Sequence, residues 1–445
     1  MPTSTDVSPS RRVALKHLER VAQDDAYVGH LQADDEDART RRQARELVAG
    51  VTRRRRWLDH VIADAYDGHY HGMEQRLRHI LRLGLYEMLY QSTPIRAVVH
   101  EYVELAKRVL RPGAGNLVNG VLRTIDRADS LPEPDTGDRA DDLGIQHSHP
   151  TWMVERWLDR YGEDKTVNLL EWNNRRPAYH VRVNPLRTSL EEVEAWLDEH
   201  DVVYTRSPYL DNSLRLMRLQ TLVQSDLLDD GHVAVQDESA GLAVRLLDPQ
   251  PGETVIDGCA APGGKTMHMA AVMEGEGTIQ AYDTNEGRLN RVQEAATAHG
   301  VEDLVSATAA DLQALAEQDD PPQADRVLVD VPCSGLGVLG KRADLRWQRD
   351  EEDLEELMEL QDELLDAAAK LVRPGGVLVY STCTIEPEEN EQRIDAFLAR
   401  QVDFTVAPAD EHLPDEVVSP SGFLQTFPPR HRMDGAFAAR LHRSE

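Results

Sequence analysis

The chain contains three cysteines, and each ends a short stretch that begins as an apolar run typical of a β-strand. These stretches are Val255–Cys259, Val327–Cys333 and Val377–Cys383. In an open α/β sheet, the loops at the carboxyl ends of the strands converge on the ligand site. Three thiols can therefore meet beside one bound molecule, which is the arrangement that thiol-based nucleophilic chemistry needs.

A loop of small residues follows the first of these strands. Gly258–Gly264 separates the expected strand Thr254–Asp257 from a helix that begins at Lys265. Small residues let backbone N–H groups approach a ligand closely. The next expected strand, Thr278–Asp283, ends in a carboxylate that can accept hydrogen bonds from both ribose hydroxyls of an adenosine group. Asp311 stands where a third strand would end.

The spacing of the glycines indicates which adenosine ligand the loop suits. The loop lacks the first glycine of a P-loop, and it is not a G-x-G-x-x-G loop, so a phosphate chain or a dinucleotide fits poorly. A nucleoside cofactor without a pyrophosphate fits better, namely S-adenosylmethionine. The alternative is a structural turn between strand and helix, and the acid at the end of the second strand favours the cofactor.

Hydrophobic periodicity divides the chain. Apolar residues recur at helical spacing through residues 10–127. Tyr179–Val183 alternates like a strand, and Ser189 with Glu192 forms a capping-box signature. Farther on, apolar strands alternate with longer helical stretches, as in a parallel sheet. The expected order is an all-helical domain over 1–130, a linker over 131–146, a small α+β subdomain over 147–230 and an α/β domain over 231–445.

The chain is strongly acidic, with 79 acidic and 49 basic residues and a formal net charge of −30. One interpretation is that it repels nucleic acid. The interpretation we favour is adaptation to a salty cytoplasm, because the Debye length falls to about 3 Å at 1 M salt. The scarcity of lysine, only six residues, supports a halophilic origin.

Basic charge is concentrated in one place. Residues 39–56 hold eight arginines and one acid. Arginine retained in an otherwise acidic chain favours RNA contact. Pairing at the surface or within the molecule is the alternative. The predicted RNA ligands of this run are Arg53, Arg54, Arg55 and Arg56.

The sequence offers little sign of a membrane, a metal or a disulfide framework. It contains no apolar run of about 18 residues, and its start lacks the order of a signal peptide. Three cysteines without a CxxC spacing, and the lack of HExxH, argue against metal ligation and disulfides. We expect a monomeric cytoplasmic protein without a metal.

Three motifs in fixed order carry a family resemblance: Cys259–Thr266 (CAAPGGKT), Asp330–Gly335 (DVPCSG) and Tyr380–Thr384 (YSTCT). Supporting stretches are Arg182–Thr188, Gln236–Ala240 and Arg432–Phe437. Together they resemble the NOL/NOP/Sun family of RNA 5-methylcytosine methyltransferases. The stretches Arg45–Asp59, Ile80–Tyr86 and Gly115–Arg123 look like a NusB-type RNA-binding domain. That combination is the layout of bacterial small-subunit ribosomal RNA methyltransferases in the family.

The resemblance implies an α/β fold with a Rossmann-like S-adenosylmethionine-dependent methyltransferase domain, preceded by the α+β subdomain and the all-α NusB-like domain. It implies that Cys383 is the nucleophile, that Cys333 assists elimination and that Asp330 hydrogen-bonds the cytosine. Chemistry alone does not rank the thiols, because DNA cytosine methyltransferases use the cysteine of a Pro-Cys loop, which would select Cys333. The implied cofactor residues are Cys259, Ala260, Ala261, Pro262, Gly263, Gly264, Lys265, Asp283, Asp311 and Asp330.

Several assignments keep alternatives. Cys259 can simply be a small buried hydrophobe. Lys265 can pair with Asp330, lower a thiol pKa or support the helix. Further RNA ligands are expected at Arg182, Asn184, Arg430 and Arg432. The expected partner is small-subunit ribosomal RNA. Transfer RNA is the alternative substrate, and a non-catalytic RNA-binding assembly factor is the alternative class of protein.

Overall fold

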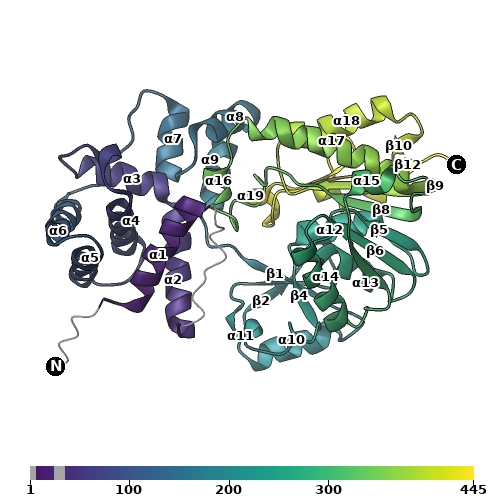
Figure 1. Cartoon of the computed structure of the whole chain (residues 1–445), viewed down its shortest axis with the longest axis horizontal. Helices are drawn as coiled ribbons and strands as arrows, with labels where there is room; N and C mark the ends of the chain where they lie inside the picture. The colour runs from purple at the N-terminus through teal and green to yellow at the C-terminus, as the bar shows by residue number, and fades with distance from the viewer. Residues whose placement is uncertain (1–6, 25–35) are drawn as a thin grey trace. The chain divides into compact units, whose positions relative to one another are not determined.

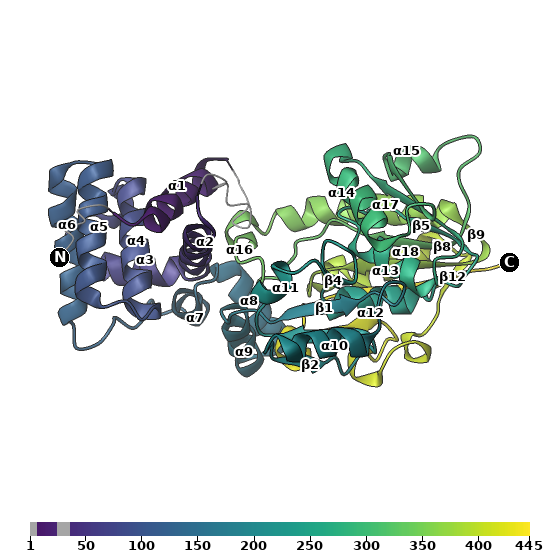
Figure 2. The same cartoon turned by 90° about the horizontal axis from the view of Figure 1, so that it is seen from below.

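The computed structural model describes residues 7–24 and 36–445, which form two compact units. One unit contains the described residues up to Arg175 together with Leu339–Arg349. The other contains Arg176–Val338 and Asp350–Glu445. Figures 1 and 2 show the first unit as packed helices and the second as two sheets with helices against them. The fold class expected from the sequence is confirmed.

Helices form the first unit. They are α1 (Pro9–Asp24), α2 (Ala38–Arg53), α3 (Arg55–Asp64), η1 (Tyr70–Gly72), α4 (Gln75–Tyr90), α5 (Ile95–Val109), α6 (Pro112–Arg127), α7 (Arg139–His147), α8 (Thr151–Tyr161), α9 (Glu163–Asn173) and α16 (Leu345–Gln348). The apolar periodicity of the sequence forms their core. Leu77 and Ile80 of α4 pack there with Tyr102 of α5 and Leu122 of α6.

The stretch 131–146, predicted as a linker, is helical over its second half. The carboxylate of Asp138 caps α7 by accepting a hydrogen bond from the backbone N–H of Asp141. Arg56 of α3 donates a hydrogen bond to the Asp141 carboxylate at 2.6 Å, which attaches α7 to α3. The linker prediction therefore does not hold for this half, where Asp138 caps a helix and Asp141 pairs with an arginine.

A four-stranded antiparallel sheet begins the second unit. Its strands are β1 (Tyr179–Val183), β2 (Tyr204–Arg206), β3 (Ser213–Leu216) and β4 (Val233–Val235), in the order β2-β3-β1-β4. Helices α10 (Leu190–Glu199) and α11 (Gln220–Val223) share an apolar core with it (Figure 2). The capping box at Ser189 is present. The predicted boundary at 230/231 is wrong, because β4 pairs with β1.

The larger sheet follows. Its strands are β5 (Thr254–Asp257), β6 (Thr278–Asp283), β7 (Val305–Ala309), β8 (Ala324–Asp330), β9 (Val372–Thr382), β10 (Phe404–Val406), β11 (Leu424–Gln425) and β12 (Phe437–Arg443). The order is β10-β12-β9-β8-β5-β6-β7, with β11 beside β12. Strands β5 to β9 pair in parallel, and β12 is antiparallel to β9. The strand order reverses at β5, which is where open α/β sheets bind ligands.

Helices cover both faces of this sheet (Figure 1). One face carries α12 (Glu238–Leu247), α13 (Gly264–Val272) and α14 (Glu286–His299), and the other carries α15 (Leu312–Ala316), α17 (Asp353–Leu371) and α18 (Glu391–Arg400). Short elements η2 (Pro387–Glu389), η3 (Ala409–Glu411), η4 (Asp415–Val417) and α19 (Pro428–His431) complete the chain. Across residues 7–24 and 36–445, every helix is too short or too polar to span a membrane.

The connection between β8 and α17 contributes Leu339–Arg349 to the first unit. Arg346, at its centre, has no exposed surface. Its guanidinium donates hydrogen bonds to the backbone carbonyls of Ser148 at 3.0 Å and Asn173 at 3.2 Å, and to the side-chain oxygen of Asn174 at 3.0 Å. The guanidinium of Arg346 thus provides hydrogen-bond donors to backbone carbonyls at the ends of α7 and α9.

We expect Arg346→Met to lower the free energy of unfolding of the first unit by about 3 kcal/mol or more, because it leaves several buried carbonyl groups without donors. Urea titration followed by circular dichroism measures the change. Arg111→Met is the matched control, since Arg111 is 67% exposed and its ion pair with Glu74 spans 3.3 Å. A loss no larger than that of the control contradicts the anchoring role.

Candidate active site

The predicted site residues follow the carboxyl ends of the parallel strands. The small-residue loop follows β5, Asp283 ends β6, and Asp330 ends β8. Cys333 comes three residues after the end of β8, and Cys383 directly follows β9. Because these strands are parallel, the residues lie along one edge of the sheet.

The two predicted catalytic thiols are in contact. The Sγ atoms of Cys333 and Cys383 are 3.1 Å apart, and the backbone N–H of Cys383 donates to the Sγ of Cys333 at 3.3 Å. Cys383 is exposed, whereas Cys333 is partly buried. The hydrogen bond with Cys383, followed by burial, raises the pKa of the Cys333 thiol well above its usual value. Cys333 therefore keeps its proton at neutral pH.

An ion pair lies next to the thiols. The Lys265 ammonium donates to the Asp330 carboxylate at 2.5 Å, and the Ser381 hydroxyl donates to its other oxygen at 2.6 Å. Burial opposes the charge of Lys265, but the charge and hydrogen bond of Asp330 raise the pKa of this lysine, and the Cys383 sulfur adds to the effect. A permanent cation thus interacts electrostatically with Cys383. Of the roles considered for Lys265, the structure contains the ion pair with Asp330.

The small-residue loop is tied to the end of β6. The Asp283 carboxylate accepts hydrogen bonds from the backbone N–H of Ala261 at 3.2 Å and of Asn285 at 2.9 Å. Gly263 has a φ of 102°, and a Cβ there would lie 3.2 Å from the Cα of Val292. The loop thus needs glycine where it passes α14. Asp311, by contrast, is exposed and caps α15.

Two groups beneath the loop are buried. Burial raises the pKa of Asp257 to about 6, although the Thr266 hydroxyl donates to its carboxylate at 2.7 Å. Burial also raises the pKa of Cys259, and nearby carboxylates strengthen the effect. Cys259 packs against the core of the sheet. Its environment is that of a small hydrophobe, the alternative kept for it from the sequence.

The predicted RNA-binding arginines of α2 and α3 make contacts within the first unit. Arg53 donates to the carbonyl of Gly340 at 3.0 Å. Arg54 stacks over Tyr90, and Arg55 stacks over Trp347, at 5.2 and 5.1 Å from the ring centroids. Arg56 donates to the carbonyl of His149 and to Asp141. Each of the four arginines thus has a partner within this unit, as the alternative expected, while Arg55 is also exposed and RNA contact stays a prediction.

The other predicted RNA ligands separate into two pairs. Arg182 and Asn184 are each only 1% exposed. Arg182 donates to the Gln236 side chain at 2.7 Å, and Asn184 donates to the carbonyl of Gly231 at 2.9 Å. The predicted surface contact is wrong for both, because they pack inside. Arg430 and Arg432 are exposed, as an RNA contact requires.

Residues that sequence reasoning missed lie close behind the thiols. Glu389 and Asn390 are buried and hydrogen-bond to residues beside Cys333 and Cys383. The signal was the run Glu386–Asn390 directly after the Cys383 motif, where four polar residues surround one proline. Nothing in composition distinguishes such a run from an exposed turn, and only tertiary packing buries it.

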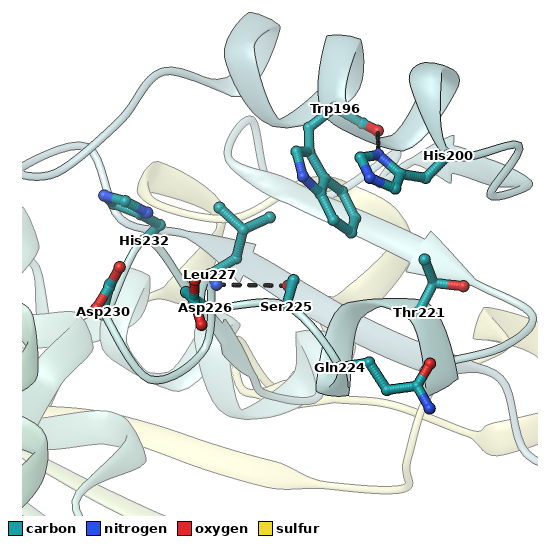
Figure 3. Close-up of a pocket in the computed structure, with 9 residues that line it drawn as sticks. All are labelled: Trp196, His200, Thr221, Gln224, Ser225, Asp226, Leu227, Asp230 and His232. Carbon is teal, nitrogen blue, oxygen red and sulfur yellow. Dashed lines mark hydrogen bonds between the residues drawn. The ribbon is translucent and has the colours of Figure 1, made fainter.

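A cavity of about 530 Å³ lies on the small sheet domain, away from the strand ends (Figure 3). Trp196 lies on α10, and His200 directly follows the end of this helix. Their rings stack on each other with centroids 4.0 Å apart. Across the opening, the turn after α11 contributes Gln224 and Asp226. None of the predicted catalytic or cofactor residues lines it. Within the described ranges, no cluster of three His, Cys, Asp or Glu side chains has the arrangement of a metal site.

The reversed strand order, the small-residue loop after β5 and the acid ending β6 define a Rossmann-like domain of the methyltransferase class. Residues 244–442 match the family described as 16S rRNA methyltransferase RsmB/F. Residues 8–127 match the NusB family, and residues 149–222 match the ferredoxin-like domain of RsmF/B-like methyltransferases. The chain belongs to the RsmB/F family of 16S rRNA methyltransferases. The family resemblance stated from the motifs is confirmed.

Individual relatives are similar over nearly the whole chain. A Synechocystis sp. protein named "Probable ribosomal RNA small subunit methyltransferase B" is 37% identical, over 91% of both chains. The ribosomal RNA small subunit methyltransferase B of Klebsiella pneumoniae is 34% identical, over 89% of this chain and 88% of its own. The crystal structure of PH0851 matches with a TM-score of 0.80 and 29% identity, over 100% of this chain and 99% of that one.

The environments of the three thiols predict the order in which they react with iodoacetamide. At pH 8 Cys383 should react first, because it is exposed, while raised pKa values keep Cys333 and Cys259 protonated. In Cys383→Ala, Cys333 should react faster, roughly tenfold for each unit by which its pKa falls. Mass spectrometry of the labelled peptides measures each rate, and Cys259 is the internal control. Labelling of Cys333 before Cys383 in the unaltered protein contradicts this account.

Proposed function

We propose that the protein transfers a methyl group from S-adenosylmethionine to carbon 5 of a cytosine in small-subunit ribosomal RNA, through a covalent bond between Cys383 and the base. The observation that carries the proposal is the contact between two thiols beside the Lys265–Asp330 pair. The family description and the names of the relatives support the RNA substrate. Such a substrate implies a cytoplasmic enzyme.

The chemistry explains why a thiol is needed. Carbon 5 of cytosine is a poor nucleophile. Addition of the Cys383 thiolate to carbon 6 forms an S–C6 bond and makes carbon 5 electron-rich, which splits one difficult step into two easier ones. Hydrogen bonding at the base edge stabilises charge in the ring. The target base must leave its stack to reach the thiol.

The surroundings of the two thiols favour this division of labour. Cys383 is the exposed thiol of the pair and can reach a base, and the charge of its sulfur is among the causes that raise the pKa of Lys265. Cys333 retains its proton beside the same sulfur, so it is suited to assist when the S–C6 bond breaks. Asp330, held by Lys265 and Ser381, is oriented to hydrogen-bond the cytosine.

The residues at the end of β5 fit an adenosine cofactor. Asp283 accepts from the loop through Oδ2 and from Asn285 through Oδ1 and remains partly exposed, and Asp311 offers an exposed carboxylate at the next strand end. Glycine at 263 and 264 keeps side chains out of the loop. S-adenosylmethionine, when bound, supplies an electrophilic methyl group. Loss of the carbon 5 proton to solvent water, which reaches the exposed Cys383, and departure of the Cys383 sulfur from carbon 6 then restore the aromatic ring and free the product.

Exposed arginines and surface charge bear on how the RNA is held. Arg430, Arg432 and Arg55 are the predicted ligands whose side chains are exposed, and phosphate contacts there would position the RNA without reading its bases. The acidic, lysine-poor composition supports action at high salt, where long-range repulsion of RNA is screened.

Replacement of each thiol should separate the two roles. With labelled S-adenosylmethionine and unmodified small-subunit ribosomal RNA, Cys383→Ala should lose methylation by about 10³-fold or more and form no protein–RNA adduct. Cys333→Ala should accumulate the adduct, because release is impaired. Denaturing gel electrophoresis measures the adduct, and nucleoside analysis locates the methyl group. An adduct in Cys383→Ala reverses the roles, and methylation outside carbon 5 of cytosine refutes the proposal.

The cofactor assignment predicts a selective defect in Asp283→Asn. Loss of a charged hydrogen-bond acceptor should weaken S-adenosylmethionine binding by about 10- to 100-fold, as measured by isothermal titration calorimetry. Glu286→Gln is the matched control, because Glu286 is an exposed acid in the first turn of α14. Equal dissociation constants for the two variants would remove Asp283 from the cofactor site.

A further inference from the structure

Glu389 is a buried acid that the proposed mechanism leaves unused. It ends η2 and has no exposed surface. A buried carboxylate is costly unless hydrogen bonds compensate for the water that it loses. It lies six residues after Cys383 in the sequence and contacts the residue that follows Cys333.

Three donors in the described part of the chain satisfy this carboxylate. Oε1 accepts from the backbone N–H of Ser334 at 2.8 Å and from the Gln361 amide at 2.9 Å. Oε2 accepts from the Ser334 hydroxyl at 2.5 Å. No basic side chain of the described residues pairs with it. The three donors to Glu389 are neutral groups, and two of them belong to Ser334, the residue directly after Cys333.

The carboxylate fixes a direction of hydrogen bonding. The hydroxyl of Ser334 donates its one proton to the Glu389 carboxylate, so its oxygen is left to accept. The oxygen of Ser334 then accepts from the Thr384 hydroxyl, 2.8 Å away. Thr384 directly follows Cys383. One acid therefore orders a chain of hydroxyls that joins the residues after both cysteines.

The residues before both cysteines are held from the same place. The amide of Gln361, which donates to Glu389, also donates to the carbonyl of Pro332 at 3.0 Å. Asn390 accepts from the hydroxyl of Thr382 at 2.6 Å and donates to the carbonyl of Thr384 at 3.2 Å. All of these side chains except that of Pro332 are buried. Both neighbours of each cysteine are thus anchored to the Glu389–Asn390 corner or to its partner Gln361.

We propose that Glu389 is a positioning residue that sets the relative placement of the Cys333 and Cys383 thiols through Ser334 and Thr384. The inference rests on the proposed two-thiol reaction, because that reaction needs one sulfur to attack and the other to assist at the same base. A misplacement of about 1 Å in such a site costs about 10²-fold in rate.

Glu389→Gln tests the proposal with almost no change of volume. The amide reverses the direction of hydrogen bonding toward Ser334. We expect kcat for cytosine methylation to fall by about 10- to 100-fold, with KM values for RNA and S-adenosylmethionine nearly unchanged. The ratio of the iodoacetamide labelling rates of Cys333 and Cys383 should also change. Asp395→Asn, an exposed acid on α18, is the control and should change neither.

Ser334→Ala keeps the test decisive if the first variant folds poorly. It removes the hydroxyl between Glu389 and Thr384 but retains the backbone donor. Its kcat should fall similarly, and the double variant should be little worse than either single one, because both act through one chain of hydrogen bonds. Additive losses contradict the proposal.

Other outcomes also decide the matter. Unchanged kcat and labelling ratio in Glu389→Gln overturn the proposal. A loss of kcat matched by weaker binding of both substrates and a lower melting temperature shows general damage and overturns it equally. If the unaltered protein forms neither adduct nor 5-methylcytosine, the proposed function fails, while the labelling ratio still tests whether Glu389 positions the thiols.

Discussion

The parallel pairing of β8 with β9 is the constraint on which the site depends. Asp330 is paired with Ser381, and the two cysteines follow these residues by three and two positions. Neighbouring strands lie about 4.8 Å apart, so loops leaving paired positions in the same direction must meet. A slip of one residue would turn Asp330 away from its face and separate the thiols. The register between β8 and β9 therefore determines which side chains can meet at this edge of the sheet.

Close backbone packing then limits how those loops run. The N–H of Gly337 donates to the carbonyl of Cys383 at 3.1 Å, and its own carbonyl accepts from the N–H of Gly435 at 2.9 Å. A Cβ on Gly337 would lie 1.9 Å from the Gly435 carbonyl oxygen. Both thiol loops and the motif near the chain end thus form one layer. Glycine is required at position 337 because of this approach, whereas φ decides the case of Gly263.

Local sequence patterns predicted the helices and strands better than they predicted the tertiary contacts of individual side chains. The strands Thr254–Asp257 and Thr278–Asp283 and the loop between them follow from apolar runs and small residues. The failures concern side chains with tertiary partners. The strand expected at Tyr179–Val183 is present, yet Arg182 in it, predicted as an RNA ligand, is buried and donates to Gln236. Likewise, nothing in the composition of the arginine run indicated that Arg55 lies over the ring of Trp347.

Environment, rather than residue type, distinguishes the two thiols. Both cysteines lie in loops at the same edge of the sheet, and the chemistry of the sequence alone did not show which thiol attacks. In the folded chain, Cys383 is exposed, while the hydrogen bond with the Cys383 sulfur, followed by burial, raises the pKa of the Cys333 thiol and keeps its proton in place. Different surroundings can give two identical side chains different roles in one reaction. The contact that joins the two thiols also makes them unequal, as the proposed addition and elimination at one base would require.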